Sequence, residues 1–389
     1  MAIALKKQPQ IGIARANLLS AQGRTGQTAS ALNPQFVGNA GLNDQRDIKN
    51  STGAVGNPVT ASVTLRQLIY DFGRTRDQVR QQSSIERSFQ QALTRTQQTV
   101  ALQVRVAFYD LIQSIANVAT SEANVSNRQR QLDQAQARMD SGLGAPVDVV
   151  QAKTNLADAA ISLTTSRDTV LTNRVALAQL LGIDSRTPIV PASAKEIKLD
   201  NESDLELLVT DALKNRPDIK AAQETVTAAR YGVFAANKDP LPTVTANAGV
   251  NGRGANDPFP TQTATFGVNV TWTFGDGGLA AGKRKEAHGS EDAARQNLIQ
   301  ISNQAVSEVS QYFVDLQSAS QRVNLAQVEV ANALELVRIS EGRYTGGLGQ
   351  FLDVTSAQNS LFTANQRLSQ AQEDVERTRA RLRTAIGLM

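Results

Sequence analysis

Alternating apolar and polar side chains mark short segments in both halves of the chain. Residues 59–66, 243–250 and 264–272 each put apolar side chains on one face and Thr, Ser, Asn or Gly on the other, and a fourth such segment begins near 33–42. A period of two predicts β-strands whose two faces meet unlike environments. Strands of about ten residues suit a membrane-spanning barrel, which needs at least about eight strands. Four strands from one chain could therefore not close one.

The rest of the pattern is helical. Residues 74–140 contain no proline and no glycine, which predicts a helical rod about 100 Å long. A matching helix is predicted over 282–344. Shorter helices are predicted over about 3–22, 147–181, 205–237 and 352–386. A helix of about 20 residues and one of about 35, stacked end to end, would nearly match one long rod.

Heptads run along these helices. Leu361, Leu368, Val375 and Leu382 are seven residues apart. Three residues after each comes a small or polar side chain: Ala364, Ala371, Thr378 and Ala385. The same seven-residue step appears at Leu156, Leu163, Val170 and Leu177, and at Val323, Val330, Val337 and Tyr344. The pattern predicts coiled-coil seams in which large side chains interlock with small ones.

The whole series of elements occurs twice. Gly142 and Gly347 are 205 residues apart, and so are Asp148 and Asp353. We interpret residues 1–183 as a first structural repeat and 205–389 as a second of the same order, with 184–204 as a linker or strap. The loops between paired strands are predicted over about 43–58 and 251–260.

Each repeat contains one Gly-rich turn between its long helix and the helix that follows. In the first turn, either Gly142 or Gly144 can end the long helix in the left-handed conformation. Asp148 and Asp353 are predicted to cap the helices that begin after the turns. A helical-hairpin turn alone explains these residue types. The functional alternative is that the tips, with Leu143 and Leu348, form a docking surface for another protein.

Composition excludes several kinds of chemistry. The chain has no cysteine, one histidine and a net charge of +4. We therefore expect no metal site, no cofactor, no nucleic-acid partner and no enzymatic activity. No run of 18 apolar residues occurs, so no transmembrane helix is expected. The first residues contain no apolar stretch long enough for a signal peptide, so any targeting segment is expected to be missing from this chain.

Several pieces together resemble the TolC-like outer membrane efflux proteins. They are the duplication, "RQLIYDFGRTRDQVRQ", "NVTWTFGDGGLAAGKRKEA", "NRPDIKAAQ", and the pattern GLG-x-x-x-DV at both turns. The resemblance covers nearly the whole chain, and the order of these motifs carries it. It implies an α+β, mostly α fold in which three chains form a 12-stranded outer-membrane β-barrel and a periplasmic α-barrel of coiled-coil helices.

The resemblance also implies a function. The chain would be a homotrimeric, passive exit duct of a tripartite efflux or type I secretion system. Its helical part would lie in the periplasm, its strands would contact outer membrane lipid, and it would work with a periplasmic adaptor and an ABC-type or proton-driven inner membrane transporter. The exported substrate stays open: drug, metal ion or protein. A non-membrane coiled-coil scaffold of the cell envelope is the alternative, and it leaves the alternating strands without a purpose.

Site residues follow from the same resemblance. The adaptor would dock at Gly142, Leu143, Gly144, Gly347, Leu348 and Gly349. Tyr344, Asp353 and Ser356 would lie near the narrow periplasmic entrance. Two positions depart from the family pattern: Ser356 stands where an aspartate is common, and Gly349 where a basic residue is frequent. An acidic ring at the entrance would then come from Asp353 or from elsewhere.

Overall fold

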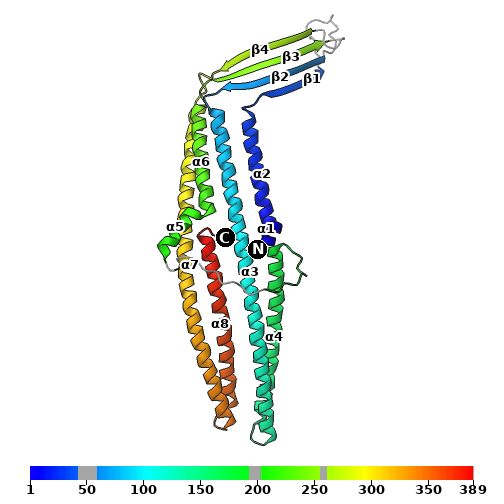
Figure 1. Ribbon diagram of the computed structural model, residues 1–389, viewed down its shortest axis with the longest axis vertical. Coiled ribbons are helices and arrows are strands. Elements are labelled where there is room, and N and C mark those ends of the chain that lie inside the picture. Colours follow the sequence, from blue (N-terminus) through cyan, green and yellow to red (C-terminus); the bar gives the residue numbers. More distant parts are fainter. Residues whose placement is uncertain (43–58, 192–201, 203, 255–260, 389) are drawn as a thin grey trace. The chain divides into compact units, whose positions relative to one another are not determined.

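The chain folds into long helices and one four-stranded sheet (Figure 1). A computed structural model describes residues 1–42, 59–191, 202, 204–254 and 261–388. In chain order the elements are α1 (Ala2–Lys7), α2 (Pro9–Ser30), β1 (Gln35–Leu42), β2 (Val59–Tyr70), α3 (Arg74–Asp140), α4 (Pro146–Leu181), α5 (Leu205–Asn215), α6 (Pro217–Lys238), β3 (Thr243–Gly254), β4 (Thr261–Thr271), α7 (Leu279–Thr345) and α8 (Phe351–Ala385).

The order of elements repeats in the two halves of the chain. Each half contains two helices, two strands, a helix of 67 residues and a final helix of about 35 residues. The predicted mostly helical, internally duplicated fold is confirmed. The predicted loop at 43–58, residues 255–260 of the second strand loop and most of the predicted linker lie outside the described residues.

Two predicted helices are each broken by a proline. The expected single helices over about 3–22 and 205–237 were wrong, because each is two helices that meet at Pro9 and Pro217. Proline forces the residue before it out of the helical conformation. Gln8 and Arg216 therefore have extended ψ values of 122° and 126°. The similar sequences ALKKQPQI at 4–11 and ALKNRPDI at 212–219 thus place the same break in both halves.

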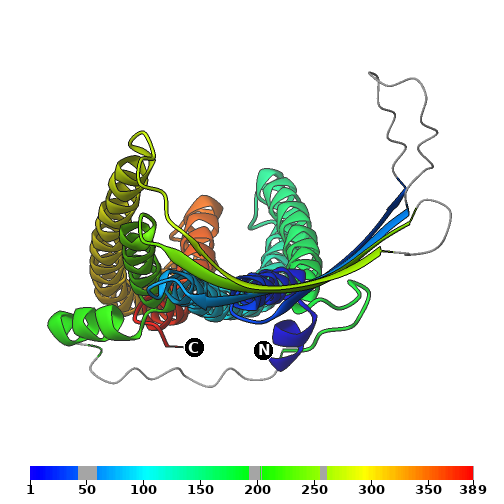
Figure 2. The same ribbon diagram turned by 90° about the horizontal axis from the view of Figure 1, so that it is seen from above.

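The four strands pair in the order β1-β2-β3-β4, and every pair is antiparallel (Figure 1). The central pair, β2 with β3, joins the two halves of the chain, with Val63 opposite Val250. Figure 2 shows that the sheet is curved. Because strand neighbours match in register, the apolar faces of all four strands coincide on one side.

The same turn leads from a strand into each long helix. The Asp71 carboxylate accepts hydrogen bonds from the backbone N–H of Gly73 (3.0 Å) and Thr75 (2.7 Å). Asp276 accepts in the same way from Gly278 (2.9 Å) and Ala280 (2.6 Å). The carboxylates satisfy backbone donors that a helix start leaves unpaired. This local role accounts for the sequences Asp-Phe-Gly at 71–73 and Asp-Gly-Gly at 276–278.

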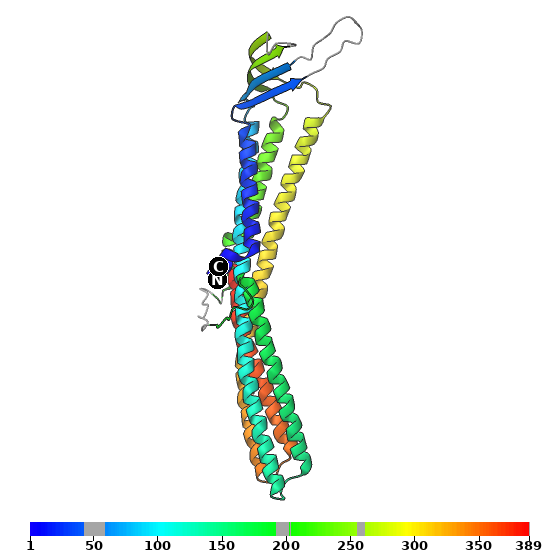
Figure 3. The ribbon, with the colours of Figure 1, turned by 90° about the vertical axis from the view of Figure 1, so that its right-hand side faces the viewer.

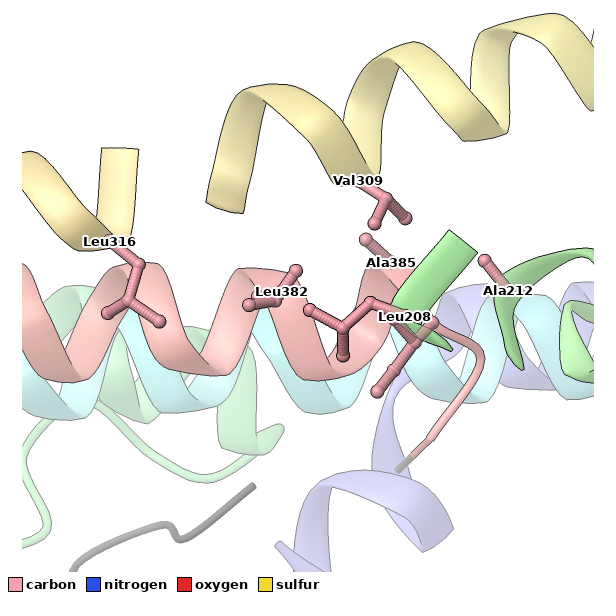
Figure 4. Close-up of a cluster of buried hydrophobic side chains, with 7 residues drawn as sticks. Leu208, Ala212, Val309, Leu316, Leu382 and Ala385 are labelled. Carbon is pink, nitrogen blue, oxygen red and sulfur yellow. The ribbon is translucent and has the colours of Figure 1, made fainter. Parts of the chain in front are cut away.

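The chain divides into two compact units. One contains Met1–Ile13, Thr94–Pro217 and Ser302–Met389, and the other contains Ala14–Leu93 and Asp218–Ile301, which includes the sheet. In the first unit, α4 runs beside the C-terminal part of α3 (Figure 3). A core cluster in this unit joins α5, α7 and α8 (Figure 4). Its buried members are Leu208, Ala212, Val309, Leu316, Leu382, Ala385 and Ile386.

Small residues form the deepest seam of α8. Ala364, Ala371, Thr378 and Ala385 are all buried, whereas Leu361, Leu368 and Val375 of the heptad are half-buried. Small side chains let neighbouring helices approach closely. The structure therefore confirms the predicted role of the small residues in the helix packing. The last heptad leucine, Leu382, is fully buried in the core cluster with α5 and α7.

Polar contacts bind α8 to its neighbours. Asn155 of α4 donates to Thr355 Oγ1 (3.4 Å), and Tyr109 of α3 donates to Glu376 Oε2 (3.5 Å). Burial raises the pKa of Glu373 above its usual value, and Arg377 partly offsets this by lowering it. The nearby carboxylates of Glu376, Asp110 and Asp374 raise the pKa further. One carboxylate oxygen of Glu373 is buried without a hydrogen-bond partner. Ionised Glu373 is therefore a source of instability in this helix packing.

Candidate functional site at the two helical turns

The turn after α3 and the turn after α7 have the same backbone. Gly142 and Gly347 have φ values of +76° and +74°, in the left-handed region that favours glycine. Leu143 N donates to Arg138 O (2.9 Å), and Leu348 N donates to Arg343 O (2.8 Å). These six-to-one bonds are those of a Schellman helix end. The repeated glycines therefore encode one turn used twice.

The third glycine of each turn allows close approach of the backbone. A Cβ at Gly144 would lie 2.8 Å from the backbone nitrogen of Met139, and one at Gly349 would lie 3.1 Å from the Cβ of Arg343. The helix end would have to move to accept a side chain at Gly144. Gly144 and Gly349 thus hold the chain against the end of the long helix, and neither is needed for a positive φ.

Each turn presents a leucine. The side chains of Leu143 and Leu348 are 74% and 79% exposed in the chain. In a Schellman motif the apolar residue after the glycine usually packs back on the helix. Here neither does, so the two turns display a pair of apolar side chains to their surroundings.

The helices after the turns begin differently from each other. The N-cap of α4 is Ala145, which makes no side-chain cap bond, and Pro146 is the first helical residue. Asp148 is therefore the third residue of α4 and does not hold the cap position that the sequence predicts, because proline is well suited to start a helix. In α8 the N-cap is Gln350, and Asp353 accepts from its backbone N–H (3.3 Å) in a capping box.

Asp148 instead contacts the other hairpin. The Tyr344 hydroxyl donates to Asp148 Oδ2 (3.3 Å), which links the end of α7 to the start of α4. Tyr344 is only 5% exposed. Burial raises its pKa, and the Asp148 carboxylate raises it further by charge and by the hydrogen bond. The tyrosine therefore stays protonated as a donor at neutral pH.

Arg138, near the end of α3, crosses to the same place. Its guanidinium lies 4.8 Å from the centroid of the Tyr344 ring, and Nη1 donates to Thr345 O (3.1 Å). Nη2 also donates to Leu143 O in its own turn (3.4 Å). One side chain thus bridges the two turns. Sequence reasoning missed this residue, although a basic residue in the last turn of a helix is a known signal for capping the final carbonyls.

The inner side of this cluster is apolar. Tyr344 packs against Phe351 with ring centroids 5.6 Å apart, in a buried group with Ala135, Val149, Ala152 and Val354. Asp353 and Ser356 lie on the exposed side of α8. Of the three residues expected near an entrance, Tyr344 is thus buried in the single chain, and Asp353 and Ser356 are exposed.

The described residues contain no group of three or more His, Cys, Asp or Glu side chains that could hold a metal ion. Across the same part of the chain, no helix has the length and hydropathy needed to cross a membrane.

Comparisons with known proteins place both halves of the chain in context. Residues 2–183 and 208–388 match the sequence model of a family described as outer membrane efflux protein. The outer membrane protein TolC of Escherichia coli is 22% identical, over 98% of this chain and 80% of its own length. The outer membrane efflux protein BepC of Brucella suis is 26% identical, over 92% of this chain and 78% of its own. The crystal structure of the outer membrane protein VceC of Vibrio cholerae superposes with a TM-score of 0.86 at 22% identity, covering 99% of this chain and 94% of that one.

Proposed function

The chain belongs to the outer membrane efflux protein family, and from that premise we propose that three copies form a channel in the outer membrane. The channel is the passive exit duct of a tripartite efflux or type I secretion system. Its helical part lies in the periplasm, where it meets an adaptor protein that connects it to an inner membrane transporter of the ABC or proton-driven type. Energy comes from that transporter, and the duct supplies the path.

The exposed apolar face of the sheet is the observation that carries this proposal. Phe266 is 84% exposed, and Phe36, Val63, Val250 and Val268 on the same face are also exposed. The opposite face is lined by Thr, Ser and Asn. A curved sheet with one apolar and one polar face suits a barrel wall between lipid and water. Three copies of four strands give a barrel of twelve strands, an even number as in other barrels of this kind. Closing the barrel would pair the free edges of β1 and β4.

Aromatic pairs at the helix-facing ends of the strands support the same placement. Tyr70 ends β2 and lies beside Phe72 with ring centroids 4.8 Å apart, and Trp272 and Phe274 follow β4 with centroids 4.4 Å apart. All four side chains are exposed. Aromatic residues gather in girdles at the two surfaces of a membrane, where their rings suit the headgroup region. The two pairs would form such a girdle at the periplasmic surface.

Exposed apolar stripes on two helices support assembly of several copies. A helix advances 100° per residue, so the exposed apolar residues of α4 fall within a sector of about 120°. On α7, five exposed apolar residues fall within about 80°, while Leu334 is exposed on another side. The α4 stripe is Val147, Val150, Ile161, Leu171 and Val175. The α7 stripe is Val314, Leu325, Val328, Leu336 and Ile339. We propose that α4 of one copy packs on α7 of the next.

The two turns supply the proposed docking and gate site. Leu143 and Leu348, held by Gly142, Gly144, Gly347 and Gly349, offer exposed apolar side chains for the adaptor. The link between Tyr344 and Asp148, with Arg138 across it, holds the hairpins together in a closed state. Asp353 and Ser356, exposed on α8, would line the entrance with it.

The test combines extraction, size and conduction. The purified protein is expected to leave membranes only with detergent, to have the mass of a trimer, and to conduct ions after reconstitution into planar lipid bilayers. Leu325→Glu and Leu336→Glu place charges on the α7 stripe and should yield monomers, whereas Leu334→Glu, exposed on another side of α7, should leave the trimer intact. A protein that stays soluble as a monomer and does not conduct would refute the channel and favour the scaffold.

A further inference from the structure

The polar face of the sheet carries a charge pattern of its own. Within the bounds of the four strands the only charged residues are Arg66 on β2 and Arg253 on β3. Arg66 is opposite Asn247, and Arg253 is opposite Thr60, so both belong to the Thr-, Ser- and Asn-lined face. No strand residue is acidic. The face is therefore cationic, with two positive charges for each chain.

Both guanidinium groups are available to ions. Arg66 and Arg253 are exposed, and neither makes an ion pair with a described residue. Arg253 lies six residues along β3 from Asn247, the partner of Arg66, which separates the two arginines by about 20 Å along the strand. The charges thus stand near the two ends of the polar face, one toward the helices and one toward the opposite ends of the strands.

Assembly would turn these positions into two rings. In the proposed trimer, twelve strands about 4.8 Å apart and tilted by about 40° give a barrel of radius about 12 Å. With side chains projecting inward, the open lumen has a radius smaller than the Debye length of about 10 Å at 0.1 M salt. Every ion that crosses the barrel would therefore pass within screening distance of three guanidinium groups, twice.

We propose that the strand section of the duct selects for anions, so that it favours small anions and organic solutes with carboxylate, sulfate or phosphate groups. The inference rests on the proposed channel function and names a solute class for it. Rings of Arg or Lys are the usual basis of anion preference in pores, and lumen-facing residues set selectivity in barrels. Screened Coulomb attraction to a ring of three charges gives roughly a three-fold enrichment of a monovalent anion.

The experiment measures the reversal potential of the trimer in bilayers of zwitterionic phosphatidylcholine under a KCl gradient of about 0.1 M. The double variant Arg66→Gln/Arg253→Gln is expected to lower the permeability ratio of chloride to potassium at least three-fold relative to the unmodified protein. Arg66→Lys/Arg253→Lys keeps both charges and should retain the ratio. Thr263→Gln, which adds bulk without charge to the polar face of β4, should also retain it.

One further measurement needs no variant. The chloride preference contributed by exposed charges should shrink when the salt is raised to about 1 M, where the Debye length is about 3 Å. An unchanged ratio in the Arg-to-Gln variant, or an equal loss in the Lys variant, overturns the anion-selective section while leaving the channel in place. An unmodified protein that does not conduct at all overturns the proposed function itself.

Discussion

Replacing Arg138 by alanine should uncouple the two helical turns. Two of its contacts cross between hairpins: the hydrogen bond to Thr345 O and the stacking on the Tyr344 ring. A hydrogen bond from a charged donor contributes about 1.5 kcal/mol, which partial exposure reduces to about 1 kcal/mol. The cation–π contact contributes about 1 kcal/mol. The loss is about 2 kcal/mol, or roughly 30-fold in the local opening equilibrium at 1.4 kcal/mol for each tenfold.

Hydrogen–deuterium exchange of the purified protein, read by mass spectrometry, measures this opening. The informative amides are Leu143 N and Leu348 N, which are bonded to the ends of α3 and α7. Their exchange should accelerate about 30-fold in Arg138→Ala if local opening controls it. Arg343→Ala is the matched control, because Arg343 occupies the same position in the other hairpin, is exposed, and has no described side-chain contact. Equal acceleration in both variants, or none in Arg138→Ala, would refute the bridging role.

Three further predictions concern stability, each measured as thermal unfolding by circular dichroism in detergent. Gly387→Ala should destabilise the protein by about 2 kcal/mol or more, because φ is +83° and a Cβ would lie 2.8 Å from backbone atoms. Gly282→Ala in α7, where a Cβ would meet open space, should be neutral or stabilising. Equal effects of the two substitutions would contradict this. Arg216→Ala should cost about 3 kcal/mol by stranding Glu308, its partner at 2.6 Å, and a change below about 1 kcal/mol would count against the pair. Glu373→Gln should raise the free energy of unfolding at pH 7 more than at pH 4. The pKa of Glu373 in the folded protein lies above its usual value of 4.5, so the protein has its full stability while Glu373 is protonated below pH 4.5. It loses that contribution as the pH rises through the folded-state pKa, and glutamine, which cannot ionise, avoids the loss. Equal gains at both pH values would argue against it.

Residues at the turns show how far local patterns reach. The Gly-rich turns were predicted to end the long helices, but the pattern did not decide which glycine takes the left-handed conformation. The structure gives positive φ to Gly142 and Gly347. The predicted span 74–140 coincides with α3. The run contains no proline or glycine, the two residues that most strongly destabilise a helix interior. The single helices expected over 3–22 and 205–237 failed at Pro9 and Pro217, where a proline signal in the sequence was given too little weight.

Contacts between distant segments were beyond such reasoning. Nothing in the spacing of Arg138, Asp148 and Tyr344 indicates that they meet, because they come from three helices of two hairpins. Asp148 was assigned a local role as a cap, yet its partner is 196 residues away. The docking and gate residues themselves stay predictions, to be tested on the assembled protein.

The sequence by itself determined the long helices, the alternating strand segments and the two Gly-rich turns, and that the series occurs twice, because periodicity, proline and glycine act within a few residues along the chain. Only the tertiary structure decided that β2 pairs with β3 and so unites the halves in one sheet. It also decided that small residues form the deepest seam of α8 and that Tyr344 reaches Asp148. These outcomes depend on packing between segments far apart in sequence, where the fit of surfaces outweighs any local preference.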